Sequence, residues 1–139
     1  HIRYAASSAA ASGNLQGLRV IRALGVDIGK PVPGRGPLII SAAWTGQTNV
    51  VAYLLSAGVD IETKDKFGGT ALSRAAEMNQ TDTVRLLLDH GANPNVRDLE
   101  GGNTPIDLCY LNAIHKGIDP TPTISLIAAA GGKANTSNE

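Results

Sequence analysis

The stretch LLLDHGANPNVRD, residues 86–98, is one of four related segments in this chain of 139 residues. Each segment has an apolar run, then a glycine, then polar or small residues. The four glycines are Gly25, Gly58, Gly91 and Gly131, in the segments VIRALGVDIGK, YLLSAGVDIETKD, LLLDHGANPNVRD and LIAAAGGKAN. The first three lie 33 residues apart, whereas the fourth follows after 40 residues. A period in this range is typical of solenoids, in which each unit packs against its neighbours.

One unit of the repeat predicts two short helices and a turn. Thr70 begins TALSRAAEMN (70–79) and is a good N-cap, because its hydroxyl can accept a hydrogen bond from a free backbone N–H. The segment TDTVRLLLDH (81–90) has apolar residues at helical spacing, and Gly91 after it suits a left-handed C-terminal turn. Asn, Asp and Gly follow, and these residues favour turns. We therefore expect positive φ at Gly91 and at the matching Gly58.

Three longer segments share these positions: GGTALSRAAEMNQTDTVRLLLDHGANPNVRD (68–98), GRGPLIISAAWTGQTNVVAYLLSAGVDIETKD (34–65) and GNTPIDLCYL (102–111). They resemble the ankyrin repeat pattern G-x-T-P-L-H-x-A-A-x-x-G followed by V-x-x-L-L-x-x-G-A-D. The family's histidine is replaced by Ile40, Ser73 and Asp107. The resemblance covers essentially the whole chain and is weakest over residues 1–12. It implies an all-α solenoid of about four stacked helix-turn-helix units with β-turn or hairpin loops, an L-shaped stack with eight helices and no continuous sheet.

We expect a single domain, 1–139, in which the fourth unit is longer than the others. The units span about 1–33, 34–66, 67–100 and 101–139. If Ala113 matches Asn79, the six residues IHKGID (114–119) are extra. We expect them to emerge as a loop between the two helices of the last unit, because stacked helices cannot absorb an insertion. The longer loop either reflects neutral variation in loop length or extends a contact surface.

The two ends of the chain raise separate expectations. Because the first residue is His1 rather than Met, we take the chain as an excised or processed piece. The first unit is either an N-terminal cap or a truncated internal repeat. The last unit has alanines in place of bulky residues and a polar tail, TSNE (136–139), so we expect a C-terminal cap.

Composition excludes several classes of partner. Lys plus Arg equal Asp plus Glu at 12 each, and no basic stripe typical of nucleic-acid binding is visible in the sequence. No apolar run approaches the roughly 20 residues of a membrane span. We therefore expect neither nucleic acid nor membrane as a partner. The single cysteine, Cys109, excludes an internal disulfide and favours a cytoplasmic location only slightly, so the compartment stays open.

Residues capable of catalysis or metal binding do not form a recognisable site. His1, His90 and His115 have no metal-ligand spacing to one another or to Cys109. His90 falls at a helix C-terminus, where an imidazole can bond the last carbonyls. Cys109 takes the place of Ala42 in the repeat and is expected to be a buried small residue. We expect no enzyme activity, no metal and no cofactor.

Without a catalytic or metal site, we look for a binding function on the surface of the repeats. We expect each unit to bury its second helix and one side of its first, leaving the inner face of the first helix and the loop tips exposed. The only Trp and the only Phe fall on positions expected to be exposed, although Trp44 could instead pack flat against a neighbouring unit. The predicted partner-contacting residues are Trp44, Phe67, Arg74, Glu77, Met78, Lys66, Leu108 and Leu111.

The family resemblance implies a non-catalytic protein–protein interaction module. The partner would be another protein, held on the concave helix face and the loop tips, and the chain itself would be a monomer. Two alternatives stay open: the chain is the recognition arm of a larger enzyme or sensor, or it is a small stand-alone inhibitor or protective partner protein.

Overall fold

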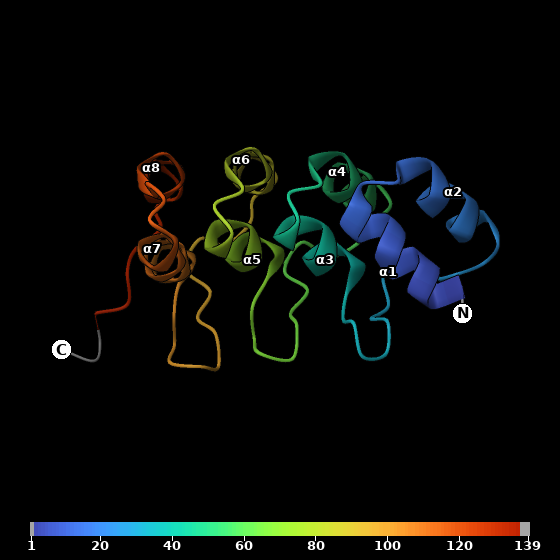
Figure 1. The fold of residues 1–139 in the computed structure, drawn as a ribbon, viewed down its shortest axis with the longest axis horizontal. Coiled ribbons are helices and arrows are strands. Elements are labelled where there is room, and N and C mark those ends of the chain that lie inside the picture. Colours follow the sequence, from blue (N-terminus) through green and yellow to red (C-terminus); the bar gives the residue numbers. More distant parts are fainter. Residues whose placement is uncertain (1, 137–139) are drawn as a thin grey trace.

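The computed structural model describes residues 2–136, which fold into eight α-helices arranged as four consecutive pairs (Figure 1). The helices are α1 (Ile2–Ser12), α2 (Leu15–Ala23), α3 (Leu38–Trp44), α4 (Thr48–Ser56), α5 (Ala71–Glu77), α6 (Thr81–Asp89), α7 (Pro105–Lys116) and α8 (Thr121–Ala129). The first helices of the pairs lie in one row and the second helices in another, while the connecting loops project beyond the first row, as expected for an L-shaped stack. Within the described part, strand pairing is limited to one isolated bridge between Val32 and Gly36.

Local signals place the helix ends. The Thr70 hydroxyl accepts a hydrogen bond from the Ser73 N–H at 3.3 Å, so the predicted N-cap of α5 is confirmed. The two predicted left-handed turns are also confirmed, with φ of 91° at Gly58 and 84° at Gly91. A residue without a Cβ adopts such a conformation at little cost, which explains why a glycine follows the second helix of each pair.

The first row of helices is the more deeply buried one, which reverses our expectation. Six of the seven residues of α5 are buried, whereas α6 buries Thr83, Val84 and Leu87. The reason is that α5 packs against α3, α7 and its own partner α6. Alanines such as Ala75 and Ala76, both fully buried, let these neighbours approach closely.

Glutamine side chains tie the second and third pairs each to the pair before it. Gln47 Nε2 donates to the Ala11 carbonyl oxygen and Gln80 Nε2 to the Trp44 carbonyl oxygen, both at 3.2 Å. These acceptors lie at the C-terminal ends of first helices, where carbonyls have no partner within the helix. A Cβ on Gly46 would lie 2.6 Å from Gln80 Cδ, so the glycine leaves room for the amide.

The last pair differs from the expected loop insertion. Helix α7 has 12 residues where α5 has seven, because residues 112–116 continue the helix; three of the six residues 114–119 are therefore helical and only 117–119 leave the helix. Ala113 would have to adopt positive φ to end the helix at the matching place, which is costly for alanine. The helix therefore continues to Gly117, whose φ is 66°. The longer helix carries three exposed large hydrophobic side chains, Tyr110, Leu111 and Ile114, and a fourth, Ile118, follows its C-cap.

Asn79 connects the third pair to this longer fourth pair. It has φ of 55°, the one positive value among the described non-glycine residues, at the position that Gly46 holds in the preceding unit. Its side-chain amide donates to the Asp119 carbonyl oxygen at 3.5 Å. Its side-chain oxygen accepts a hydrogen bond from the Thr123 hydroxyl. An asparagine tolerates this backbone conformation and also supplies the contacts that a glycine would lack.

Candidate partner-binding groove

A concave hollow of about 610 Å³ lies between the first row of helices and the connecting loops. We call it the groove, and we call the segments 24–37, 57–70 and 90–104 the first, second and third connecting loops. The groove is lined by Ser7, Ala11, Arg35, Ile40, Ser41, Trp44, Thr45, Asp65, Phe67, Arg74, Glu77 and Glu100. Its walls thus come from the first three pairs of helices and all three loops.

The two large aromatic side chains of the groove are accessible to solvent. Trp44, the last residue of α3, is 41% exposed, so it is not a buried packing residue. Phe67 on the second connecting loop is 42% exposed. The ammonium nitrogen of Lys66 lies 5.1 Å from the centroid of the Phe67 ring, within the range of a cation–π contact.

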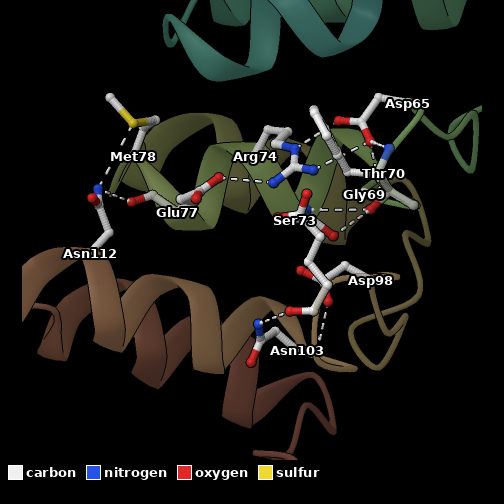
Figure 2. Close-up of polar contacts among 12 residues, drawn as sticks. Asp65, Gly69, Thr70, Ser73, Arg74, Glu77, Met78, Asp98, Asn103 and Asn112 are labelled. Carbon is white, nitrogen blue, oxygen red and sulfur yellow. Dashed lines mark hydrogen bonds and ion pairs between the residues drawn. The ribbon is translucent and has the colours of Figure 1, made fainter.

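Arg74 forms the floor of the groove. Its guanidinium lies between the carboxylates of Asp65 and Glu77 (Figure 2), with Nε donating to Asp65 Oδ2 at 2.8 Å and Nη1 to Glu77 Oε1 at 3.0 Å. Asp65 also accepts hydrogen bonds from the Phe67 and Gly69 backbone N–H groups. The ion pair therefore fixes the second connecting loop, and with it Phe67, against α5.

The Arg74 guanidinium lies so close to the backbone of Gly69 that only a glycine fits at this position. A Cβ on Gly69 would lie 2.5 Å from Arg74 Nη2, so a larger residue would displace the guanidinium. Arg74 is 9% exposed, and the exposed position that we expected for it is wrong. A buried charge needs a partner, and the loop supplies one in Asp65.

The charges on the groove floor do not cancel. Burial alone would raise the pKa of Asp65, but the hydrogen bonds from Arg74 and the loop backbone and the charge of Arg74 lower it on balance. Burial likewise opposes the charged form of Arg74, while Asp65 and Glu77 raise its pKa overall. Asp65 is thus ionised at neutral pH. One guanidinium between two carboxylates leaves an excess negative charge in the groove that Trp44 also lines.

A family model of ankyrin repeats, in three copies, matches residues 5–98, which span α1 to α6 and the loops between them. The chain belongs to the ankyrin repeat family. Ankyrin repeats are generally protein–protein interaction modules and are typically non-catalytic. A search of curated proteins found no match.

The ankyrin repeat architecture separates the eight predicted contact residues into two groups. Trp44, Phe67, Arg74 and Glu77 line the groove, whereas the other four do not. Lys66 lies on the second connecting loop outside it, and Leu111 is exposed on α7. Met78 is half-buried, with its sulfur 3.9 Å from Asn112 Nδ2. Leu108 is only 7% exposed, so the surface position expected for it is wrong.

The sequence reasoning missed several residues of the groove in this ankyrin repeat chain. Asp65 and Arg35 lie on the connecting loops, and Ile40 lies on α3. A signal for Asp65 was present, because it precedes the glycine pair of its loop in the way that Asp98 does in the next. Such an Asp can accept bonds from the backbone of its own turn, and Asp98 does so from the Asn103 N–H at 2.9 Å.

The described residues considered for metal binding and catalysis form no metal cluster in the ankyrin repeat stack. No cluster of three or more His, Cys, Asp and Glu suited to a metal occurs among residues 2–136, and His1 lies outside them. The His90 ring nitrogen Nδ1 is 2.8 Å from the Leu86 carbonyl oxygen. Cys109 is fully buried, and burial raises the pKa of its thiol to about 11. No described helix has the length and apolar character needed to cross a bilayer.

Proposed function

We propose that this ankyrin repeat chain is a non-catalytic interaction module that binds a protein partner in the groove, with Trp44 as the anchor. The observation that carries the proposal is the exposed indole in a concave surface, next to a second exposed aromatic ring and a charged floor. Interface energy concentrates in a few central residues, and Trp, Tyr and Arg are enriched among them.

The exposed area of Trp44 sets the size of the expected effect. Fully burying an aromatic side chain removes about 150–250 Å² from water, so the 41% that is exposed corresponds to roughly 80 Å². At about 25 cal/mol per Å², covering it contributes about 2 kcal/mol, which corresponds to roughly 30-fold in affinity. The indole is already held at the end of α3, so little ordering cost is added when a partner covers it.

The groove would bind its partner in the same way in both alternatives that the sequence leaves open. As the recognition arm of an enzyme or sensor, it would position a substrate protein. As a small inhibitor or protective partner, it would cover a site on its target. In both cases residues 1–139 alone should hold the partner.

The test is capture of proteins by the immobilised chain, compared between wild type and Trp44→Ala. Val20→Ala is the matched control, because Val20 is an exposed apolar residue of α2, 51% accessible, that neither lines the groove nor lies on a connecting loop. We expect a specific partner to bind the wild type and Val20→Ala equally and to bind Trp44→Ala roughly 30-fold more weakly. Equal binding to all three chains would refute Trp44 as the anchor.

A second measurement separates loss of contact from loss of folding. Because Trp44 is the only tryptophan, its quenching by acrylamide reports directly on the groove. The free protein should be quenched readily, and the bound protein should be protected. Thermal unfolding of Trp44→Ala, followed by circular dichroism, should show that the variant is still folded at the assay temperature.

A further inference from the structure

The zero net charge of the chain conceals a charge difference along the stack. Residues 1–59 contain five basic and one acidic side chain, whereas residues 60–139 contain seven basic and eleven acidic ones. The first part therefore carries a formal charge of +4 and the second part −4. The charged residues of the first part are Arg3, Arg19, Arg22, Asp27, Lys30 and Arg35.

The groove has the same order of charge along the stack. Arg35 lies at one end, on the first connecting loop before α3. Trp44 and Phe67 lie next, on α3 and the second loop. Glu77 at the end of α5 and Glu100 on the third loop lie at the other end. Figure 1 shows that these elements follow one another along the long axis of the molecule.

The terminal charges of this row are accessible to a partner. Arg35 is exposed, and its guanidinium carbon lies 5.4 Å from the centroid of the Tyr4 ring, which holds the side chain against α1. Glu100 is exposed, and within residues 2–136 its carboxylate has no hydrogen bond or ion pair. Glu77 shares Arg74 with Asp65, so the acidic end keeps its excess of negative charge.

We infer that the groove selects its partner by the order of charge in one segment. The segment places an acidic side chain beside Arg35, an apolar or aromatic side chain against Trp44 and Phe67, and a basic side chain beside Glu77 and Glu100. This inference rests on the proposed function and adds the chemistry of the partner to it. A segment with the opposite order would bring like charges together at both ends, and such repulsion is an effective means of discrimination.

The probe is a displayed library of random 12-residue peptides, selected on the immobilised 139-residue chain and again on Trp44→Ala. Peptides that bind the wild type but do not bind the Trp44→Ala variant are bound in the groove. We expect them to carry acidic residues on one side of an apolar residue and basic residues on the other. One such peptide and a copy with its acidic and basic residues exchanged are then titrated, with Trp44 fluorescence as the readout.

Reversing the charge of Glu100 tests whether the groove recognises the order of charge in the peptide. We expect the selected peptide to bind at least tenfold more tightly than its charge-exchanged copy at low salt, and Glu100→Lys to reduce that ratio at least fivefold. Asp89→Lys is the matched control: it changes the net charge equally on an exposed residue of α6 outside the groove and should leave the ratio unchanged. The ratio should also fall with added salt, because exposed charges are screened.

The outcomes separate this inference from the proposed function. Trp44-dependent peptides without a common charge order, or a ratio that Glu100→Lys leaves unchanged, would overturn the inference while the groove itself stays a binding site. An equal effect of Asp89→Lys and Glu100→Lys would also overturn it, because the whole-chain charge would then be the cause. Selection of no Trp44-dependent peptide would count against the proposed function, and the inference would fall with it.

Discussion

Two glycines with similar backbone conformations should respond differently to the same substitution. Gly46 has φ of 74° and Gly58 has φ of 91°, so alanine is strained at both positions. Their surroundings differ, however. A Cβ on Gly46 would lie 2.6 Å from Gln80 Cδ, whereas a Cβ on Gly58 would have nothing within 4 Å. Gly46→Ala should therefore destabilise the chain more than Gly58→Ala.

The magnitude follows from two contributions. Left-handed backbone costs an alanine about 1–2 kcal/mol, and the stiffer unfolded chain returns about 0.4–1 kcal/mol, which leaves about 1 kcal/mol at either site. At Gly46 the Gln80 side chain must also move and lose its hydrogen bond to the Trp44 carbonyl oxygen. Such a bond contributes about 1 kcal/mol. We expect a free-energy loss of about 1 kcal/mol for Gly58→Ala and about 2 kcal/mol for Gly46→Ala.

Urea unfolding followed by far-ultraviolet circular dichroism measures both losses. The comparison should be repeated in chains that carry Gln80→Ala, which removes the side chain that the new Cβ would meet. In that background the two glycine substitutions should cost the same, because the coupling between positions 46 and 80 is gone. Equal losses in the wild-type background, or an excess loss at Gly46 that survives Gln80→Ala, would refute the reasoning.

Three further predictions concern the core, the thiol and the groove floor. Leu87→Ala should lower the free energy of unfolding by about 2–5 kcal/mol because Leu87 is fully buried, whereas Leu99→Ala at an exposed position should change it by less than about 0.5 kcal/mol in the same urea assay. The Cys109 thiol, with its pKa raised to about 11 by burial, should resist a thiol-specific dye at pH 8 and react once urea unfolds the chain; rapid reaction of the folded protein would contradict this. Asp65→Asn should lower the melting temperature at pH 7. Because the pKa of Asp65 in the folded state lies below its ordinary value of 3.8, the difference in melting temperature between wild type and variant should persist above pH 3.8 and disappear as the pH falls through the folded-state pKa. A difference in melting temperature that does not depend on pH would show that charge is not the cause.

The features predicted correctly from the sequence are those that depend on a few neighbouring residues. The Thr70 cap and the turns at Gly58 and Gly91 are each determined within one turn of helix. The 33-residue period then extends these local predictions to the whole stack. The exposure of Trp44 also followed from its repeat position, because this position is the last residue of α3 and its side chain is accessible to solvent.

The errors arose where one unit departs from its neighbours. Arg74 and Leu108 share a repeat position and were both expected on the surface. Arg74 is instead buried by pairing with a carboxylate nine residues earlier, which a repeat alignment does not reveal. The insertion at 114–119 was placed by matching Ala113 to the repeat position of Asn79, yet a helix ends where its backbone can turn. In this unit the first suitable residue is Gly117.

Three side-chain hydrogen bonds to the ends of first helices run in one direction along the chain, from a later donor to an earlier acceptor. Gln47, Gln80 and Asn112 each donate to a backbone carbonyl oxygen near the end of the preceding first helix, the last of them to Glu77 at 2.5 Å. A ribosome releases a chain from its N-terminus. Each newly emerged donor therefore meets an acceptor on a helix that has already been synthesised. These three ties can therefore form one at a time in the order of synthesis, each when its own donor emerges.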